Sequence, residues 1–520
     1  MIQPERPCLE SDEALQPTGG AKGVMSNELR PEARSKWAWF QIERARPRQR
    51  PAWQRIADFL EITAGLDEQT AREQASRCIQ CPEPACREGC PLANRIPEWL
   101  ALTAEGHFLE AAEISMSTSN MPEICARVCP QERLCEGACI LNGRAEPVSI
   151  GAIERFINEY AISHGLLHAA PVRPNGYRVA VVGSGPGGLT CADELARRGY
   201  WVTVFESKVV PGGLLINGIP AFKLEKHLVW RRLELLKQRG VEFRLGVTVG
   251  RDVDLGELLR DYDAVFLGFG AWQAKPLDVP GAHLKGVYQA LPFLIQKNLP
   301  GALEGPEIEV RGKRVTVLGG GDSAMDCLRT ALRCGATEAI CLYRRDQANM
   351  PGSRKEYYAA LEEGARFEFL TSPIEVLGNE AGEVVGLRCQ RMELGPPDAS
   401  GRRRPVPVRG TEFEHPTDVV LVAYGFDPTP FPPDSELAQI QTHDWGGVIV
   451  DENQMTNVPG VFAGGDLVRG PSLVVHAVRD ARRAARAIDA WCQGRPPKRP
   501  VRVEPVPHSP LEAVPGLSAP

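Results

Sequence analysis

YRVAVVGSGPGGLTCADELARRGYWVTVFE, residues 177–206, decides the fold of this chain. The apolar run before Gly183 predicts a buried strand, the glycine cluster predicts a tight turn into a helix, and a second apolar run ends at Glu206. A strand, a glycine turn, a helix and a strand ending in an acid form the fingerprint of a Rossmann dinucleotide-binding unit. A glycine turn with only a structural role is the alternative, and it leaves the terminal acid unexplained.

Each residue of this fingerprint has an expected role. Gly183 permits the tight turn, Gly185 lets the backbone approach a pyrophosphate, and Gly188 lets the helix pack closely on the strand. The helix then points its N-terminus at the phosphates. Glu206 is expected to accept hydrogen bonds from ribose hydroxyls.

An altered copy of the fingerprint follows at residues 313–345, KRVTVLGGGDSAMDCLRTALRCGATEAICLYRR. Arg344 and Arg345 stand at the end of its second strand, where an acid would repel a ribose 2′-phosphate. Guanidinium groups bind phosphate through charge-assisted hydrogen bonds, so this copy is predicted to prefer NADPH to NADH. The alternative is an arginine pair that is merely exposed at a strand end.

A third glycine cluster, GVFAGGDLVRGPSLVVHAVRDARRAARAI, starts at Gly460 and again indicates a strand, a turn and a helix. Its Asp466 suggests a flavin contact near the ribityl chain. The first nucleotide domain is therefore expected to be discontinuous, with the second inserted into it. The predicted fold class is α/β, with an N-terminal α-helical domain followed by two Rossmann-like domains.

Eight of the fifteen cysteines lie in two groups just upstream of the first fingerprint. They are Cys78, Cys81, Cys86 and Cys90 in the first group, and Cys125, Cys129, Cys135 and Cys139 in the second. Close spacing followed by proline suits iron-sulfur ligation, and eight thiolates suggest two four-iron clusters. Zinc is an alternative, although only one C-x2-C pair is present. Disulfides are disfavoured because the N-terminus does not read as a secretory signal, so we expect a cytoplasmic protein.

Composition agrees with a large enzyme. The 520 residues are 43% hydrophobic and carry a formal charge of −6, which gives no reason to expect nucleic acid, and no apolar run suggests a membrane span. The predicted division is a flexible leader at 1–35, a helical cluster domain at 36–172, the FAD domain at 173–290 and 441–493, the NADPH domain at 291–440, and a proline-rich tail at 494–520.

Seven motifs, in order, make the chain resemble the small (beta) subunit of bacterial NADPH-dependent glutamate synthase. They are CIQCPEPACREGCP, ICARVCPQERLCEGAC, VVGSGPGGL, PGGLLINGIPAFKLEK, GGGDSAMD, YRRDQANMPGS and FAGGDLVRGPSLVVHA. The arrangement also resembles the N-terminal half of dihydropyrimidine dehydrogenase. The resemblance implies FAD contacts at Gly183, Gly185, Pro186, Gly188, Glu206, Gly213, Leu214, Gly465 and Asp466. It implies NADPH contacts at Gly320, Asp322, Ser323, Arg344 and Arg345.

The same resemblance implies two 4Fe-4S clusters whose ligands interleave the two cysteine groups. One cluster would be held by Cys78, Cys81, Cys86 and Cys139, and three corners of the other by Cys90, Cys129 and Cys135. The fourth corner is either Cys125 or Glu154, and the sequence leaves both open.

The expected chemistry is hydride transfer from NADPH to FAD, followed by single-electron transfer through the clusters. Cofactor stacking performs this transfer, so no acid or base residue is predicted to be catalytic. The expected partner is the large (alpha) subunit of glutamate synthase, which makes glutamate from glutamine and 2-oxoglutarate, in a hetero-oligomer. The alternatives are a stand-alone or differently partnered NADPH:acceptor oxidoreductase and, in another class, a zinc-containing scaffold that senses nucleotides.

Overall fold

A computed structural model of the chain describes residues 37–301, 306–397 and 403–496. The predicted leader, and the predicted tail from residue 497 onward, lie outside these ranges.

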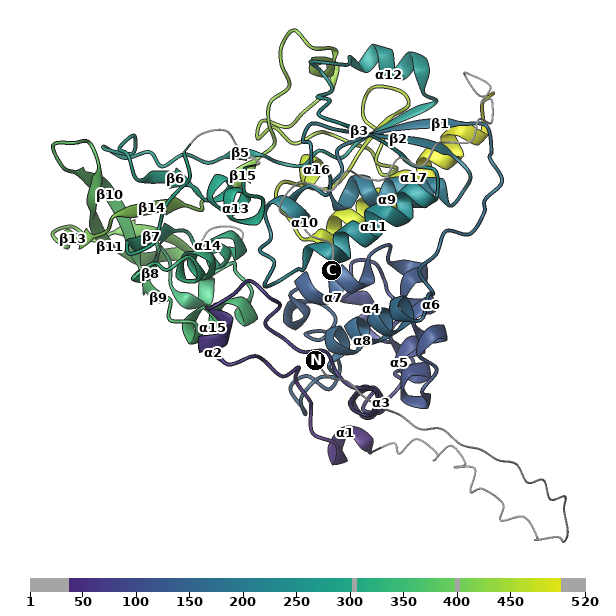
Figure 1. The fold of residues 1–520 in the computed structure, drawn as a ribbon, viewed down its shortest axis with the longest axis horizontal. Helices are drawn as coiled ribbons and strands as arrows, with labels where there is room; N and C mark the ends of the chain where they lie inside the picture. The colour runs from purple at the N-terminus through teal and green to yellow at the C-terminus, as the bar shows by residue number, and fades with distance from the viewer. Residues whose placement is uncertain (1–36, 302–305, 398–402, 497–520) are drawn as a thin grey trace, which may run out of the picture. The chain divides into compact units, whose positions relative to one another are not determined.

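Short helices form the first part of the described chain (Figure 1), as the sequence predicts. They are α1 Ala38–Gln41, α2 Ala52–Arg55, α3 Glu68–Ser76, α4 Ala85–Glu88, α5 Ile96–Glu105, α6 Phe108–Thr118, α7 Pro122–Val128 and α8 Ile150–Ser163. Helix α5 ends because Gly106 adopts a left-handed conformation, with φ of +90°. The apolar spacing of residues 98–115 predicts one buried face across a turn near Gly106, with Trp99, Phe108 and Leu109 on it. Trp99 and Phe108 are buried, but Leu109 is 38% exposed, so the prediction is wrong at Leu109.

The first nucleotide fold is a parallel five-stranded sheet in the order β16-β4-β1-β2-β3. Its strands are β1 Arg178–Val182, β2 Trp201–Glu206, β3 Glu242–Leu245, β4 Ala264–Leu267 and β16 Val461–Ala463. Its helices are α9 Pro186–Ala196, α10 Leu214–Asn217, α11 Lys226–Gln238, α12 Leu255–Asp261, α16 Asp466–Arg469 and α17 Val474–Gln493. Helix α9 packs between α11 and α17 (Figure 1). Met121, Ile124 and Cys125 of the helical domain share this fold's apolar core.

The second nucleotide fold repeats this plan, with the parallel order β6-β14-β7-β8-β9. Its strands are β6 Val287–Gln289, β7 Arg314–Leu318, β8 Glu338–Tyr343, β9 Arg366–Phe369 and β14 Val419–Val422, and its helices are α13 Ala290–Asn298, α14 Asp322–Arg333 and α15 Arg354–Glu362. All of these elements lie in the chain between β4 and β16 of the first sheet. The second fold is therefore inserted into the first, as the sequence predicts.

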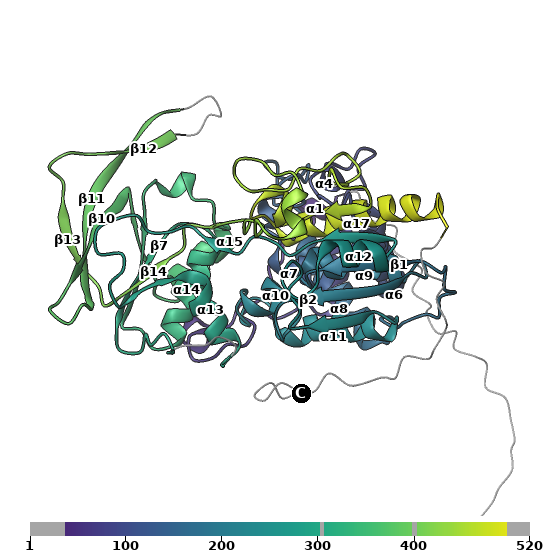
Figure 2. The same ribbon diagram turned by 90° about the horizontal axis from the view of Figure 1, so that it is seen from above.

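The chain crosses between the two folds twice, and the crossings pair with each other. Strand β5, Gln273–Ala274, runs antiparallel to β15, Phe426–Asp427. A further antiparallel sheet lies beside β7 and β14 (Figure 2). It consists of β10 Thr371–Gly378, β11 Val384–Pro397, β12 Arg403–Pro407 and β13 Phe413–Pro416. In the part of the chain that the structure describes, the remaining elements are three short 3-10 helices: η1 Gln131–Arg133, η2 Gln347–Asn349 and η3 Glu436–Gln439.

Within the described ranges, no helix combines the length and the apolar character that crossing a membrane requires.

Candidate active site

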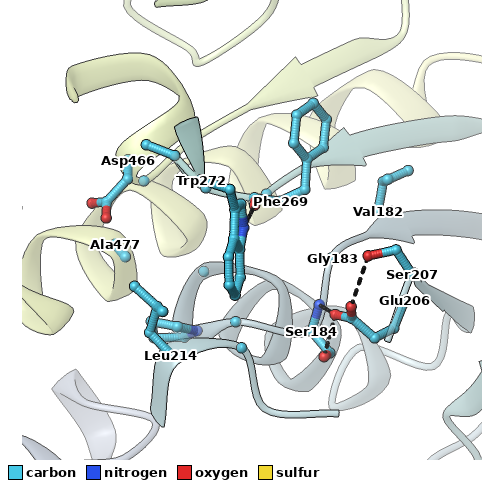
Figure 3. A pocket seen from close by; sticks show the side chains of 18 of the residues that line it. Val182, Gly183, Ser184, Glu206, Ser207, Leu214, Phe269, Trp272, Asp466 and Ala477 are labelled. Atoms are coloured by element: carbon cyan, nitrogen blue, oxygen red, sulfur yellow. Dashed lines mark hydrogen bonds between the residues drawn. The ribbon is translucent and has the colours of Figure 1, made fainter. Parts of the chain in front are cut away.

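A cavity of about 570 Å³ lies at the carboxyl ends of the first sheet's strands. Its wall includes the first glycine loop, the start of α14 with Asp322 and Ser323, and Val128 at the end of α7. The side chain of Trp272 projects into it between Leu214 and Asp466 (Figure 3). Parts of the helical domain and of both nucleotide folds therefore meet around one space.

The backbone of the first glycine loop packs so closely on its neighbours that two of its positions leave no room for a side chain. Gly183 has φ of +98°, and a Cβ there would lie 2.7 Å from the Gly268 carbonyl oxygen. A Cβ on Gly188 would lie 1.9 Å from the Gly183 oxygen, so the helix could not pack as it does. At Gly185, by contrast, a Cβ would lie 4.0 Å from the Gly268 carbonyl oxygen, an ordinary contact, and this glycine precedes Pro186 at the start of α9. The loop and helix N-terminus thus form a cradle that suits a pyrophosphate.

Glu206 ends strand β2, as predicted, and lines the cavity. One carboxylate oxygen accepts hydrogen bonds from the Ser184 backbone N–H at 2.9 Å and from the Ser184 hydroxyl at 2.6 Å. The other accepts from the Lys208 backbone N–H at 2.9 Å (Figure 3 shows the Ser184 and Ser207 contacts). The acid therefore also ties the end of β2 to the glycine loop, a role that the sequence did not indicate.

The remaining predicted flavin contacts border the same space. Gly213 and Leu214 lie where α10 begins, and Gly465 and Asp466 where α16 begins. Burial raises the pKa of the Asp466 carboxyl to about 7, against the opposing effects of the Ser472 backbone N–H and of Arg469. The Ser472 N–H donates to this carboxylate at 3.0 Å.

The second glycine loop lies at the start of α14. Gly320 packs on the ring of Tyr343, which a Cβ would approach to 2.8 Å. Asp322 accepts a hydrogen bond from the Ser353 backbone N–H at 2.9 Å. Asp322 and Ser323 line the cavity, whereas Gly320 is not among its lining residues.

Arg344 and Arg345 directly follow β8, as predicted, and neither lines the cavity. Arg344 is exposed. Arg345 is half-buried, and its Nε is buried without a hydrogen-bond partner among the described residues. A buried donor without a partner is costly, so an anion at this position would satisfy it.

The first set of predicted cluster ligands comes together across the two cysteine groups. Burial raises the pKa of the Cys86 thiol to about 12, and the neighbouring thiols of Cys78, Cys139 and Cys81 add to this rise. The structure therefore gathers Cys139 of the second group with three members of the first.

The second set gathers around a carboxyl. Burial raises the pKa of the Cys90 thiol to about 11, with smaller contributions from Glu154 and Cys129. Burial also raises the pKa of Cys135, and the charges of Glu136, Glu154, Cys90 and Cys129 act in the same direction. Asn94 Nδ2 donates to Glu154 Oε1 at 2.8 Å.

Cys125 is also close to this set. A hydrogen bond with Cys125, followed by burial, raises the pKa of Cys129. Cys125 is buried within the apolar core that α7 shares with the first nucleotide fold.

In the described ranges, no three His, Cys, Asp or Glu side chains are gathered closely enough to hold a single metal ion. A four-iron cluster separates its ligands more widely than one ion does.

Two residues of the site were not predicted from the sequence. Trp272 Nε1 donates to the Phe269 carbonyl at 2.6 Å, which fixes the ring over the cavity. Lys223 lines the cavity and pairs with Asp326 of α14 at 2.8 Å, so it joins the two nucleotide folds. Lys223 lies within the motif PGGLLINGIPAFKLEK, which offered a signal, whereas nothing marked Trp272 as different from a core aromatic.

Comparison with known families agrees with this architecture. Residues 55–166 match the family described as dihydropyrimidine dehydrogenase domain II, 4Fe-4S cluster. Residues 177–481 match the family described as pyridine nucleotide-disulphide oxidoreductase.

Curated relatives match over most of the chain. The glutamate synthase (NADPH) small chain of Escherichia coli is 45% identical, over 88% of this chain and 99% of its own length. The protein of the same name from Azospirillum brasilense is 44% identical, over 86% and 95%. A putative oxidoreductase of E. coli, AegA, is 48% identical over 84% of this chain and 68% of its own length.

A solved structure, Mycobacterium tuberculosis FprA in complex with NADPH, shares the fold. It superposes with a TM-score of 0.53 at 23% identity, covering 61% of this chain and 84% of that one.

Proposed function

Because the chain belongs to the family of glutamate synthase (NADPH) small chains, we propose that it oxidises NADPH and delivers the electrons to a glutamate synthase large subunit. That subunit would make glutamate from glutamine and 2-oxoglutarate. The chain is an NADPH-dependent oxidoreductase of the flavin and iron-sulfur type. When bound, FAD supplies the exchange between a hydride and single electrons, which iron-sulfur clusters carry.

One observation carries the proposal: a single cavity is lined by the first glycine loop, by the start of α14 and by Val128. A dinucleotide in the first fold would therefore lie beside a nucleotide in the second. Val128 directly precedes Cys129, so the same cofactor would lie beside one cysteine set. This adjacency is what a relay from NADPH to iron requires.

The residues present fit the proposed cofactors. The Gly185 cradle and Glu206 would hold FAD, and Gly320, Asp322, Ser323 and Arg345 would hold NADPH, with Arg344 as a second cation. We propose the interleaved cysteine sets as the ligands of two clusters. Glu154 is our candidate for the eighth ligand, because it lies with Cys90, Cys129 and Cys135, and because Asn94 already fixes one of its oxygens.

The proposed role of the protein is to position the cofactors and to enclose them. Trp272, Leu214 and Ala477 supply the apolar wall of the cavity and exclude water from it. Cofactor stacking would perform the proposed transfer, so we propose no acid or base residue for it.

The position of Val128 in the cavity wall also supports an order in which electrons would reach the two proposed clusters. Val128 lines the cavity and directly precedes Cys129, so the cluster that Cys90, Cys129 and Cys135 would hold would be the nearer electron acceptor. The set of Cys78, Cys81, Cys86 and Cys139 would then pass them to the partner. Its neighbours Ile79 and Ile140 are exposed apolar residues, which would suit a protein contact.

The domain boundaries predicted from the sequence are retained as proposals, as is a location in the cytoplasm. A reducing compartment keeps thiolates available for iron and supplies NADPH. A partnered complex follows from the family, and we propose a hetero-oligomer with the large subunit.

A second candidate is an NADPH:acceptor oxidoreductase with another partner. The 48% identity to a putative oxidoreductase favours it, although this chain spans only 68% of that protein. The two candidates differ in their electron acceptor and share the same site.

Reconstitution separates them. Purified chain is mixed anaerobically with a glutamate synthase large subunit, and glutamate formation from glutamine and 2-oxoglutarate is measured with NADPH. Formation of glutamate supports the first candidate. NADPH oxidation with ferricyanide, without binding to the large subunit or glutamate formation, supports the second. Colourless protein that contains zinc would support the nucleotide-sensing scaffold instead.

A further inference from the structure

Residues 350–355, MPGSRK, connect the second glycine loop to the cysteine loop at 127–133. They run from the end of η2 into the first residues of α15 in the second nucleotide fold. The cysteine loop runs from the last two residues of α7 through η1 and contains Cys129. The two segments are more than two hundred residues apart in the chain, so no sequence pattern places them together.

On one side, this segment supports the second glycine loop. The Gly352 backbone N–H donates to the Gly320 carbonyl at 2.9 Å. The Ser353 backbone N–H donates to Asp322 at 2.9 Å. Both acceptors are predicted NADPH contacts, so the segment is fixed to the nucleotide site.

On its other side, the segment forms hydrogen bonds with the cysteine loop. Arg133 donates to the Pro351 carbonyl at 2.9 Å. Glu132 accepts from the Ser353 hydroxyl at 3.1 Å and from the Arg354 backbone N–H at 3.2 Å. These contacts use groups from both segments and fix their relative position.

Lys355 makes the contact nearest to Cys129. Its Nζ donates to the Arg127 carbonyl at 2.8 Å, to the Cys129 carbonyl at 3.0 Å and to Gln131 Oε1 at 3.2 Å. All three acceptors are neutral. Among the described residues Lys355 forms no salt bridge, and its charge acts both on the Glu356 carboxylate and on the Cys129 thiol, lowering the pKa of each. The side chain is half-buried, which limits screening by solvent.

An unpaired cation here has an electrostatic consequence. Reduction adds one electron to an iron-sulfur cluster, so its charge becomes more negative by one. A fixed positive charge nearby favours the reduced state, and net charge and hydrogen bonds set the potentials of such clusters. The lysine contacts also hold the end of α7, where helix carbonyls lack partners, and so position Cys129.

We propose that Lys355 is a positioning residue that raises the reduction potential of the cluster held by Cys90, Cys129 and Cys135. The proposal rests on the proposed function, because it requires that cluster. It assigns to the nucleotide-binding insertion a second task, which is to make the first iron-sulfur acceptor easier to reduce.

The test compares three variants of the full chain, purified anaerobically with cofactors. Lys355→Met removes the charge and the hydrogen bonds, and Lys355→Arg keeps a cation. Lys285→Met is the matched control, because Lys285 forms an exposed ion pair with Glu383 beside the third sheet. Iron content is measured first, and then the midpoint potential of each cluster by EPR-monitored redox titration.

We expect Lys355→Met to shift one cluster to a more negative potential, or to lose that cluster, while the other keeps its wild-type midpoint. Lys355→Arg should restore much of the wild-type behaviour, and Lys285→Met should match wild type. Wild-type midpoints for both clusters in Lys355→Met would overturn the inference, as would an equal shift in the Lys285 control. Wild-type protein without iron would instead overturn the proposed function.

Discussion

Replacing Arg344 and Arg345 singly by alanine tests the nucleotide preference, and the structure predicts unequal effects. Arg345 has a buried Nε without a described partner, whereas Arg344 is exposed. A hydrogen bond to a charged group contributes about 1.5–3 kcal/mol. Arg345→Ala should therefore lower kcat/KM for NADPH by about 10- to 150-fold, at about 1.4 kcal/mol for each tenfold change. Arg344→Ala should cost about 1 kcal/mol or less, or about fivefold at most, as exposed ion pairs do.

The assay is anaerobic ferricyanide reduction with NADPH and with NADH in parallel. Both variants should retain the wild-type kcat/KM for NADH, because NADH lacks the 2′-phosphate. Arg366→Ala is the matched control, since Arg366 is an exposed arginine of the same sheet that pairs with Glu338 at 2.6 Å. Equal losses with the two nucleotides would refute the assignment of these arginines to the 2′-phosphate. A larger loss at Arg344 than at Arg345 would refute the argument from burial.

Three further predictions concern stability, ligation and pH. Glu363→Gln removes the buried carboxylate that pairs with both Arg329 and Arg333, so it should cost about 3–5 kcal/mol and lower the urea midpoint, and an unchanged midpoint would contradict this. Glu154→Ala should remove the EPR signal of one cluster while Cys125→Ala keeps both, and the reverse result would assign Cys125 as the ligand. The Asp466 pKa rises from 3.8 to about 7, so wild-type stability should fall as pH rises through this window. The melting temperature of FAD-free Asp466→Asn should exceed the wild-type value increasingly between these pH values, and a constant difference would contradict the shift.

The nucleotide folds were predictable because their determinants are local. The turn at Gly183, the helix after it and the acid at Glu206 follow one another within a single unit. The insertion of one fold into the other was also predictable, since the strand and helix pattern resumes at Gly460. Such periodic segments carry their own secondary-structure signal.

The ligand sets of the cysteine domain were harder to predict from the sequence. Spacing alone gave two groups of four, and only the resemblance to a family implied that Cys139 joins the first group. Helical periodicity also failed at Leu109, which follows the predicted turn at Gly106 and is exposed although the apolar pattern places it on the buried face.

Contacts between distant segments could not be predicted at all. The pairing of Lys355 with the cysteine loop, and of Lys223 with α14, depends on how the folds pack against one another. Lys355 lies outside the motifs singled out in the sequence, and Lys223 lies in the motif PGGLLINGIPAFKLEK, which does not indicate its partner on α14. Tertiary packing determines both contacts, and the spacing of residues in one sequence does not reveal that packing.

The central claim is that NADPH reduces iron-sulfur clusters through a flavin within this one chain. The most direct measurement is an anaerobic titration of the purified protein with NADPH, followed by optical absorbance and by low-temperature EPR. We predict that the yellow flavin absorbance bleaches and that a cluster EPR signal appears without any partner protein. Protein that carries both cofactors but shows neither change on addition of NADPH would contradict the claim.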